Sequence, residues 1–580
     1  MLKINCLFLI ISCLFYVNGR IIARSNVEIE KPSLEWWQDT IFYQIYPRSF
    51  KDTDGDGIGD LKGITEKLAY LKESGIDGTW LSPIFKSPMV DFGYDISDFN
   101  DIQPEYGTMK DFEELIREAN RLDIKIILDF VPNHSSDQHK WFEKSIKREP
   151  GYENFYIWHP GKILENGTRV PPNNWISIFT GPAWEWNEER QEYYFHTFTV
   201  QQPDLNFRDP LLVEAMKDVL RFWMDKGVYG FRVDAVPHLV EQDHLKDEPL
   251  NTVCCYKPNE WGYLDHIYTV NQPENYEVIK GWRETLDEYS RTHDNVSRVM
   301  MTEVYADVAT SLKYYDAGAS FSFNFGLVNN LQKDSTAKSV SDILLGWLDN
   351  VPSNYTSNWV MGNHDNNRVA TNSGPDRVDG INMMLLILPG IGVTYNGEEI
   401  GMENGHLTWE QHQDTTCIKE EFDSGKCRDF ERTPFQWDDS HMVGFTTGNN
   451  PWLPVDPSYK KLNLKLQQEA EESHWKVYKA MAELRKTDIL RYGNCSITVS
   501  ESGSSLIINR IFNKTDMYSL VFNLGSKFEN VRAFNTGVGQ VIVRSSNVKD
   551  VEVGDVVDLE NVPVNPNEAF VLKRYIKDQK

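Results

Sequence analysis

The sequence predicts an α/β protein: a (β/α)8 barrel with a small domain inserted after strand 3 and a C-terminal antiparallel β-domain. Three observations predict this fold class. Eight short apolar runs alternate with amphipathic helices, the gap between the third and fourth runs is far longer than one helix needs, and closely spaced short strands follow the last helix. A chain of 580 residues is long enough for several domains.

The eight predicted strands are continuous apolar runs, which is typical of parallel strands covered on both faces. They lie at 41–46, 78–83, 124–134, 229–235, 298–305, 319–325, 358–365 and 393–399. Apolar helix faces recur between them, such as the one formed by Leu61, Ile64, Leu68 and Leu71. An open doubly wound sheet is the alternative, but no GxGxxG sequence follows a strand to support a dinucleotide site.

The domain boundaries follow from this pattern. The barrel is predicted over 30–134 and 204–487. The inserted domain is predicted over 135–203, a stretch rich in Trp, Tyr, Asn and Pro that is too long to be one crossover. Short strands separated by turn residues predict the β-domain over 488–580.

The N-terminus predicts a secreted protein without membrane insertion. Residues 1–19 hold one Lys ahead of an apolar stretch, which is typical of a signal peptide, with a type II membrane anchor as the alternative. The C-terminal end, FVLKRYIKDQK, is polar and lacks the tail of a lipid-anchor signal.

Secretion in turn predicts disulfides and glycans. Cys417 and Cys427 lie close together in a polar loop and are predicted to pair, whereas the pairing of Cys254, Cys255 and Cys495 stays open. Glycosylation is predicted at the Asn-X-Ser/Thr sites Asn166, Asn295, Asn354, Asn494 and Asn513.

The composition excludes two classes of partner. A formal net charge of -27 repels nucleic acid and anionic membrane surfaces. An uncharged small molecule suits this chain better, and its 17 Trp and 26 Tyr offer rings that stack on sugars, although most of them are expected in the core. The oligomeric state stays open.

Polar residues gather at the C-terminal ends of four predicted strands, the end of a barrel where catalytic groups lie. They are Asp129, His134, Arg232, Asp234, Glu303, His364 and Asp365. A capping Asp often follows a single strand, but four strands ending in this way are hard to explain as caps. Carboxylates paired across a pocket are what glycoside hydrolysis requires, one ionised to attack the anomeric carbon and one protonated to release the leaving oxygen.

The spacing of these residues suggests individual roles. Arg232 lies two residues before Asp234, so both side chains project to the same side of one strand. The guanidinium is expected to lower the pKa of Asp234 and keep it ionised, with a purely structural ion pair as the alternative. His134 and His364 are expected to donate to sugar hydroxyls, and Asp365 to accept from them.

These motifs resemble those of the α-amylase family of glycoside hydrolases, and within it those of secreted insect α-glucosidases (maltases). The matching segments are DFVPNH (129–134), QPDLNF (202–207), GFRVDAVPH (230–238), MTEVY (301–305) and GNHDNNR (362–368). The resemblance extends from about Trp36 to the C-terminus.

The resemblance implies the catalytic roles. Asp234 matches the nucleophile, Glu303 the general acid/base, and Asp365 the carboxylate that grips and distorts the sugar. It further implies that anomeric configuration is retained through a covalent glucosyl-enzyme intermediate. The residues implied to support the nucleophile or bind the same glucose are Arg232, His134 and His364.

The segment PMVDFGYDISDF resembles the members that act on chain ends. There Tyr94 is implied to stack under the terminal glucose and Asp91 to bind its far hydroxyls. In ERTPFQW, Arg432 is implied to pair with Asp91 and close the pocket, with Arg428 as the nearby competitor. Ala235, directly after the nucleophile, resembles members that prefer α-1,4 links.

The implied activity is that of a secreted retaining α-glucosidase that releases terminal glucose from α-1,4-linked oligosaccharides such as maltose, and also from sucrose. Two alternatives share the motifs: a membrane-associated non-enzymatic homologue, either a transporter heavy chain or a receptor, and an isomerase of maltose and trehalose. The intact catalytic set argues against the first, and the signal peptide and glycosylation sites against the second.

The segment KDTDGDGIGD predicts a structural calcium site, with a solvated acidic turn as the alternative, and no organic cofactor is expected. Carboxylates at alternate positions coordinate hard cations, and the resemblance adds a backbone carbonyl and the identity of the ion as Ca2+. The predicted ligands are Asp52, Asp54, Asp56, Ile58 and Asp60. A second calcium site like that of amylases is predicted near Asn133, Asp204, Leu239 and Glu241.

Overall fold

The computed structural model describes residues 31–253, 255–512 and 516–575. Its contacts divide the chain into Met1–Ser33 and Leu34–Lys580, and the helices and strands described all belong to the second unit. The predicted signal peptide, Cys254 and Asn513 lie outside the described residues. The predicted domain boundaries stay predictions.

Eight parallel strands form one sheet in the order β13-β12-β11-β5-β2-β1-β15-β14. They are β1 (Ile41–Ile45), β2 (Gly78–Leu81), β5 (Lys125–Phe130), β11 (Gly230–Val233), β12 (Val299–Thr302), β13 (Phe321–Ser322), β14 (Asn358–Val360) and β15 (Ile391–Tyr395). Neighbours in the sheet follow the chain order, and all eight predicted strands are present. The predicted barrel is therefore confirmed.

The barrel closes between β13 and β14 through a side chain. Asn358 is buried at the start of β14, and its Nδ2 donates to the carbonyl of Ser322 in β13 (2.7 Å). The N–H of Asn324 donates in turn to Asn358 Oδ1 (2.8 Å). One amide thus supplies a donor and an acceptor where no ladder joins these two strands in the described sheet.

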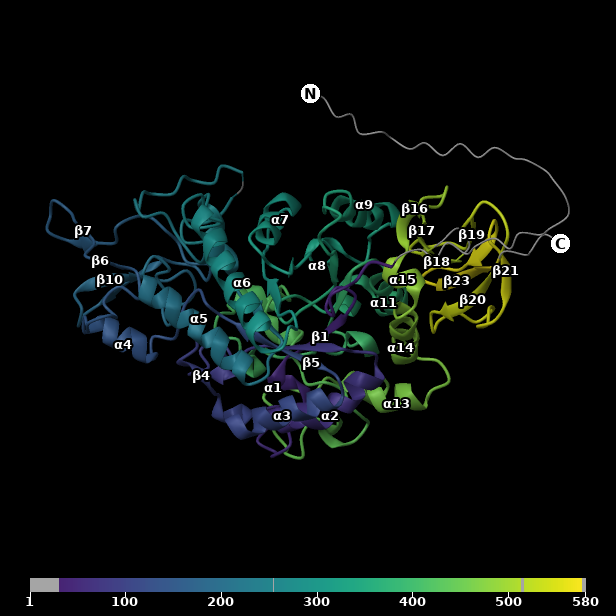
Figure 1. Cartoon of the computed structure of the whole chain (residues 1–580), viewed down its shortest axis with the longest axis horizontal. Helices are drawn as coiled ribbons and strands as arrows, with labels where there is room; N and C mark the ends of the chain where they lie inside the picture. Colours follow the sequence, from purple (N-terminus) through teal and green to yellow (C-terminus); the bar gives the residue numbers. More distant parts are fainter. Residues whose placement is uncertain (1–30, 254, 513–515, 576–580) are drawn as a thin grey trace, which may run out of the picture. The chain divides into compact units, whose positions relative to one another are not determined.

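The helices cover the outside of this sheet (Figure 1). The longer ones are α2 (Leu61–Glu73), α3 (Met109–Arg121), α5 (Pro210–Asp225), α6 (Pro273–His293), α7 (Val308–Asp316), α9 (Ala337–Leu348), α11 (Val378–Ile387) and α14 (His474–Arg485). The shorter ones are α1 (Pro47–Phe50), α4 (Lys140–Ile146), α8 (Gly326–Asn330), α10 (Val369–Ser373), α12 (Lys419–Asp423), α13 (Leu464–Glu469) and α15 (Asp488–Tyr492).

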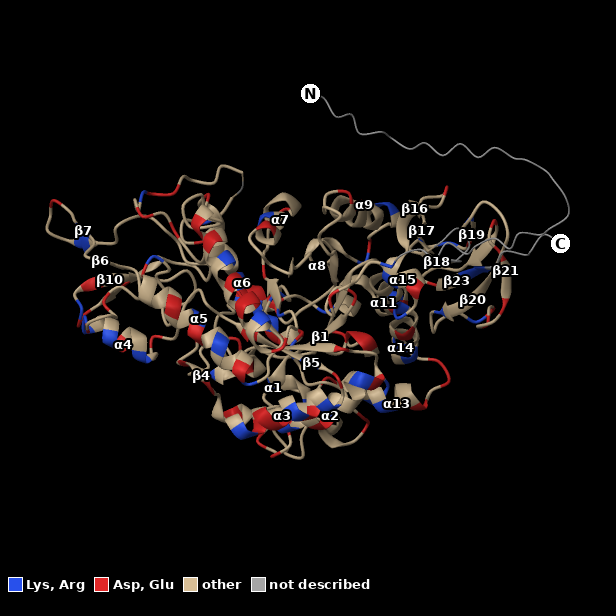
Figure 2. Ribbon diagram, in the orientation of Figure 1, with Lys and Arg blue, Asp and Glu red and all other residues tan. Residues whose placement is uncertain are grey.

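Local sequence explains how these helices begin and face. Helix α2 begins where Asp60 accepts the N–H of Gly63, and Thr108 and Asp111 form a capping box ahead of α3. The apolar face predicted for α2 is buried against the strands. Acidic and basic residues both lie along α2, α3 and α5 (Figure 2), as expected of solvated outer faces.

The long segment between β5 and β11 forms a small antiparallel sheet in the order β6-β10-β9. Its strands are β6 (Trp158–His159), β9 (Trp184–Asn187) and β10 (Glu192–Phe195), with a separate hairpin of β7 (Lys162–Ile163) and β8 (Arg169–Val170). Trp175, Trp184 and Phe195 form its own apolar core. A bridge between His134 and Asp204 holds the two ends of the segment together at the pocket.

A six-stranded antiparallel sheet ends the chain, as predicted, in the order β16-β17-β18-β23-β20-β21. The strands are β16 (Asn494–Val499), β17 (Ser505–Phe512), β18 (Asp516–Asn523), β20 (Val538–Arg544), β21 (Val556–Asp558) and β23 (Ala569–Tyr575). The sheet packs on α11, where a Cβ on Gly380 would lie 2.4 Å from the Phe522 ring. Only glycine allows this approach.

Among the described residues, no helix has the length and apolar character that a membrane span requires.

Candidate active site

A cavity of about 380 Å3 opens at the carboxyl ends of the barrel strands. Its lining includes six of the predicted site residues, Asp91, Tyr94, His134, Asp234, Glu303 and Asp365. The other three, Arg232, His364 and Arg432, are buried behind this wall and contact the residues that form it. The predicted residues thus meet around one cavity, in two layers.

Arg232 connects three acids from behind the cavity wall. It lies on β11 in register with Asp129 of the neighbouring β5, and its side chain is 1% exposed. Nη1 contacts Asp234 (2.5 Å) and Asp129 (3.0 Å), while Nη2 contacts Glu303 (2.5 Å). Glu303 also accepts the N–H of Ala235 at 3.1 Å. One guanidinium therefore holds three carboxyl groups.

The three carboxyl groups that share Arg232 shift one another's pKa values. Burial raises the pKa of Asp234 well above its ordinary value; Arg232 lowers it, but Glu303 and Asp129 raise it further. Burial likewise raises the pKa of Asp129 to about 7. Arg232 lowers the pKa of Asp234, as expected, but burial and the two neighbouring acids raise it by more, because one positive charge is set against three acids. The cluster binds a proton readily near neutral pH.

Tyr94 and His364 form a stacked pair beside this cluster. Their rings lie 5.4 Å apart and 4° from parallel. Gln44 Nε2 donates to His364 Nδ1 (2.8 Å), so Nε2 carries the proton toward the Tyr94 hydroxyl (2.6 Å), which donates to Asp129 (3.3 Å). Burial lowers the pKa of His364 to about 3, so the imidazole is neutral. The structure places His364 under Tyr94, where it fixes the ring.

The far end of the pocket is closed by an ion pair that differs from the one implied by resemblance. Arg428 Nη2 donates to Asp91 Oδ1 at 3.0 Å, and Gln202 donates to the other Asp91 oxygen. Arg432 does not make this pair: it donates to the His364 carbonyl (2.6 Å) and to Asp365 (2.8 Å). The Arg432–Asp91 pairing is thus wrong. Arg432 is 1% exposed beneath the His364–Asp365 turn, which leaves Arg428 to face the pocket.

Asp365 is the acid of this group that stays ionised. Burial raises its pKa, but His364, Arg432 and Arg428 lower it more, to about 2. His364 is neutral above about pH 3, so the two arginines hold the charge at neutral pH. Burial also lowers the pKa of His134, to about 4, and its Nε2 lies 3.0 Å from the Tyr94 carbonyl. His134 is therefore a neutral donor.

Several lining residues were not singled out in the sequence. Phe179 and Phe198 come from the inserted segment, where no motif marks them. His238 lies inside GFRVDAVPH; it is buried, lines the cavity, and its Nδ1 has no partner among the described residues. Tyr305 lies two residues after Glu303 and stacks on Phe325 at 4.1 Å. The available sequence signal for His238 and Tyr305 was that each lies within four residues of a predicted catalytic acid.

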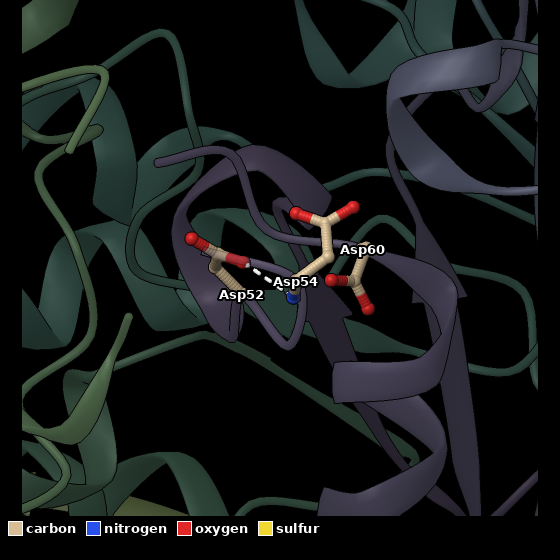
Figure 3. A group of neighbouring side chains, drawn as sticks. All are labelled: Asp52, Asp54 and Asp60. Atoms are coloured by element: carbon tan, nitrogen blue, oxygen red, sulfur yellow. Dashed lines mark hydrogen bonds between the residues drawn. The ribbon is translucent and has the colours of Figure 1, made fainter. Parts of the chain in front are cut away.

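Three of the predicted calcium ligands gather ahead of α2 (Figure 3). Carboxylate oxygens of Asp52, Asp54 and Asp60 all lie within 4.8 Å of one another. Asp56 is outside this group, and its Oδ1 accepts the N–H of Ile58 at 2.7 Å. Three carboxylates at this spacing fit a hard divalent cation.

At the second predicted metal site, the two acids already have partners within the protein. Glu241 contacts Arg208 Nη1 at 3.0 Å, and Asp204 accepts two hydrogen bonds from Thr197. Asn133 Oδ1 is buried without a partner among the described residues, and Leu239 is buried nearby. Because Arg208 already supplies a positive charge, these residues fit a cation less well than the loop before α2.

The remaining predicted features lie on loops and strand edges. A disulfide joins Cys417 and Cys427, with Cα atoms 5.5 Å apart. The four described acceptor sites are all exposed: Asn166, Asn295, Asn354 and Asn494.

Comparison with known proteins places this site in a family. The model of the alpha amylase catalytic domain matches residues 44–493. Maltase 1 of Drosophila virilis is 53% identical, over 80% of this chain and 74% of its own length. A salivary alpha-glucosidase of Aedes aegypti is 48% identical, over 85% and 86%. A human amino acid transporter heavy chain, SLC3A1, is 34% identical, over 95% and 80%.

A solved structure agrees with these relatives. The alpha-glucosyl transfer enzyme XgtA superimposes with a TM-score of 0.82 at 32% identity, over 93% of this chain and 100% of that one. The matched domain covers most of the chain and includes the strands that carry the acids. The protein is therefore a member of the α-amylase family of glycoside hydrolases.

Proposed function

We propose that this glycoside hydrolase is a secreted, retaining α-glucosidase that releases terminal glucose from the non-reducing end of α-1,4-linked oligosaccharides such as maltose, and also from sucrose. One observation carries the proposal: Asp234 and Glu303 share Arg232 at the floor of a cavity whose far end Asp91 and Arg428 close. The maltase and α-glucosidase relatives support the choice of substrate.

The chemistry follows from these positions. Asp234 attacks the anomeric carbon while Glu303 gives its proton to the glycosidic oxygen, so the C–O bond breaks and the aglycone leaves as an alcohol. Glu303, now ionised, takes a proton from water, and the water oxygen displaces Asp234 from the sugar. Two inversions retain the α configuration. Arg232 contacts both acids and stabilises the carboxylate that each step produces.

The closed end explains release of single glucose units. Asp91, Arg428 and Asp365 present a carboxylate, a guanidinium and a second carboxylate where the far hydroxyls of a bound glucose would lie. A chain continuing in that direction would collide with this wall, so only a terminal residue fits. Phe179 and Phe198 also line the cavity.

Secretion and calcium are part of the same proposal. A salivary relative, a disulfide and exposed acceptor sites support an extracellular enzyme. Asp52, Asp54 and Asp60 would hold a structural Ca2+, which would fix the loop ahead of α2. A non-enzymatic membrane-associated homologue would have no need of an intact acid cluster, so it explains this pocket less well than hydrolysis does.

The test is hydrolysis of maltose, sucrose and isomaltose by the purified protein. We expect α-glucose as the first product by NMR, and loss of several orders of magnitude in kcat for Asp234→Asn. Asp218→Asn on α5, with a side chain that is 69% exposed, is the matched control and should keep full activity. β-Glucose as first product, or normal turnover by Asp234→Asn, would contradict the mechanism.

A further inference from the structure

We propose that the Cys417–Cys427 disulfide is a positioning device for Arg428 and so sets the affinity of the pocket for a terminal glucose. The inference rests on the proposed α-glucosidase function and adds to it a part of the chain that touches no substrate. Arg428 is the next residue after Cys427, and its guanidinium closes the pocket end.

Arg428 is gripped by the segment that leads into the other cysteine. Its Nε and Nη2 form a bidentate pair with Asp414, at 2.8 Å each, and Nη2 also contacts Thr416 Oγ1 at 3.0 Å. Asp414 and Thr416 lie three and one residues before Cys417. The disulfide therefore joins the two short segments, one carrying the guanidinium and the other its carboxylate partner.

The loop between the cysteines cannot supply this alignment. The cysteines are 10 residues apart, and all of the α12 turn between them is exposed or half-buried. In contrast, Cys417 and Cys427 are buried, at 9% and 3% exposure. Closing a short loop covalently removes many conformations in which its ends separate, so the disulfide orders the two segments before sugar binds.

The pocket depends on this order because Asp91 is buried. Burial raises the pKa of Asp91, and Arg428 has the largest effect of the groups that lower this pKa. A displaced Arg428 would leave a buried carboxyl without its cation, which is unfavourable unless the group takes up a proton. Protonated Asp91 accepts hydrogen bonds from sugar hydroxyls less well, so the loss should appear mainly in substrate binding.

The first experiment compares the double variant C417S/C427S with Arg428→Lys. We expect the maltose KM to rise about tenfold in both, with kcat changed less than about threefold. Combining the two changes should add little further, because both disrupt one contact. If the disulfide were merely structural, the melting temperature would fall while KM stayed normal and Arg428→Lys kept its full effect. That outcome would overturn the proposal.

A second experiment covers the case in which the double variant does not fold. Dithiothreitol breaks the S–S bond in the folded enzyme, giving two thiols and the oxidised dithiol. The protein used is Cys495→Ser, so that this half-buried thiol does not complicate alkylation mapping. KM should rise on reduction and return on re-oxidation. An unchanged KM, with Cys417 and Cys427 both alkylated, would contradict the inference.

A binding measurement separates this inference from the proposed function. Glucose affinity measured by calorimetry needs no turnover, and it should weaken about tenfold on reduction. A protein that fails to hydrolyse maltose yet shows this weakening would refute the proposed substrate and leave the role of the disulfide intact. A protein that hydrolyses maltose but whose glucose affinity does not change on reduction would support the proposed function and refute the role of the disulfide.

Discussion

At the scale of single residues, Arg232 decides how the acids of the pocket influence one another. It contacts Asp129, Asp234 and Glu303, and its own side chain is almost fully buried. Asp129 lies on the side away from the cavity wall, yet its negative charge raises the pKa of Asp234. A residue that touches no sugar can therefore set the pH range in which the cluster keeps its proton.

Asp129→Asn tests this coupling. Hydrolysis needs one protonated acid in the cluster, so kcat/KM should fall as pH rises through the raised pKa values, of which that of Asp129 is about 7. The amide keeps the shape but removes one negative charge, which lowers the pKa of the remaining acids. We expect the alkaline limb of kcat/KM to move about one pH unit lower. A pH profile with the alkaline limb unmoved would contradict the coupling.

At the scale of elements, Asp234 and Glu303 lie one residue beyond the ends of their strands, whereas Arg232 lies within β11. The predicted strand 124–134 ends at Phe130, because the chain then leaves the sheet to bring Asn133 and His134 to the inserted segment. The predicted strand 298–305 ends at Thr302, one residue before Glu303. The apolar runs predicted the strands correctly, but the predicted ranges also included polar residues that lie beyond the strand ends.

Barrel closure by Asn358 gives a prediction about one element. Asn358→Ala removes the partner of the Asn324 N–H and of the Ser322 carbonyl, and each buried polar group left unpaired costs about 1–3 kcal/mol. We expect the melting temperature to fall by several degrees. Asn350→Ala, at an exposed amide that bonds only within its own helix end, should change it little. Equal effects of the two changes would argue against the bridge.

The Ca2+ that we propose for the loop ahead of α2 gives a second prediction at this scale. Removing Ca2+ with EDTA should leave the Asp52, Asp54 and Asp60 carboxylates repelling one another, so the melting temperature should fall, and added Ca2+ should restore it. Asp54→Asn, at the exposed member of this group, should lower the melting temperature and weaken the response of the melting temperature to Ca2+. If the EDTA-treated protein held no calcium by elemental analysis and still melted at the same temperature, the proposed calcium site would be refuted.

At the scale of the whole molecule, the sequence predicted the architecture better than the pairings within the pocket. Burial on both faces gives every barrel strand an apolar run, and this signal is local. The partner of Asp91 is not local: Arg428 and Arg432 are four residues apart, and the path of the loop decides which one faces the cavity. The net pKa of Asp234 likewise depends on how many acids converge, which no single motif contains.

A titratable contact at Asp379 helps to join the C-terminal sheet to the barrel. Asp379 of α11 accepts from Ser546, after β20, through both its N–H (2.7 Å) and its hydroxyl, and its other oxygen lies 2.6 Å from Nδ1 of His474 at the start of α14. Burial lowers the pKa of His474, but Asp379, with Asp376 beyond it, raises the pKa above its ordinary value. Burial raises the pKa of Asp379, but His474 and Ser546 bring it below its ordinary value. The charged pair therefore forms at mildly acidic pH.

This contact should make the stability of the molecule depend on pH. Because the folded-state pKa of His474 is raised, its contribution is fully present below the unfolded value of about 6.5 and is lost as pH rises through the folded value. The lowered pKa of Asp379 means that the contribution is also lost in strong acid. We expect His474→Gln to lower the melting temperature by several degrees near pH 5.5 and by much less at pH 8. His441→Gln, at an exposed histidine, should produce no such pH-dependent difference. A deficit of the same size at both pH values would mean that packing rather than charge joins the sheet to the barrel.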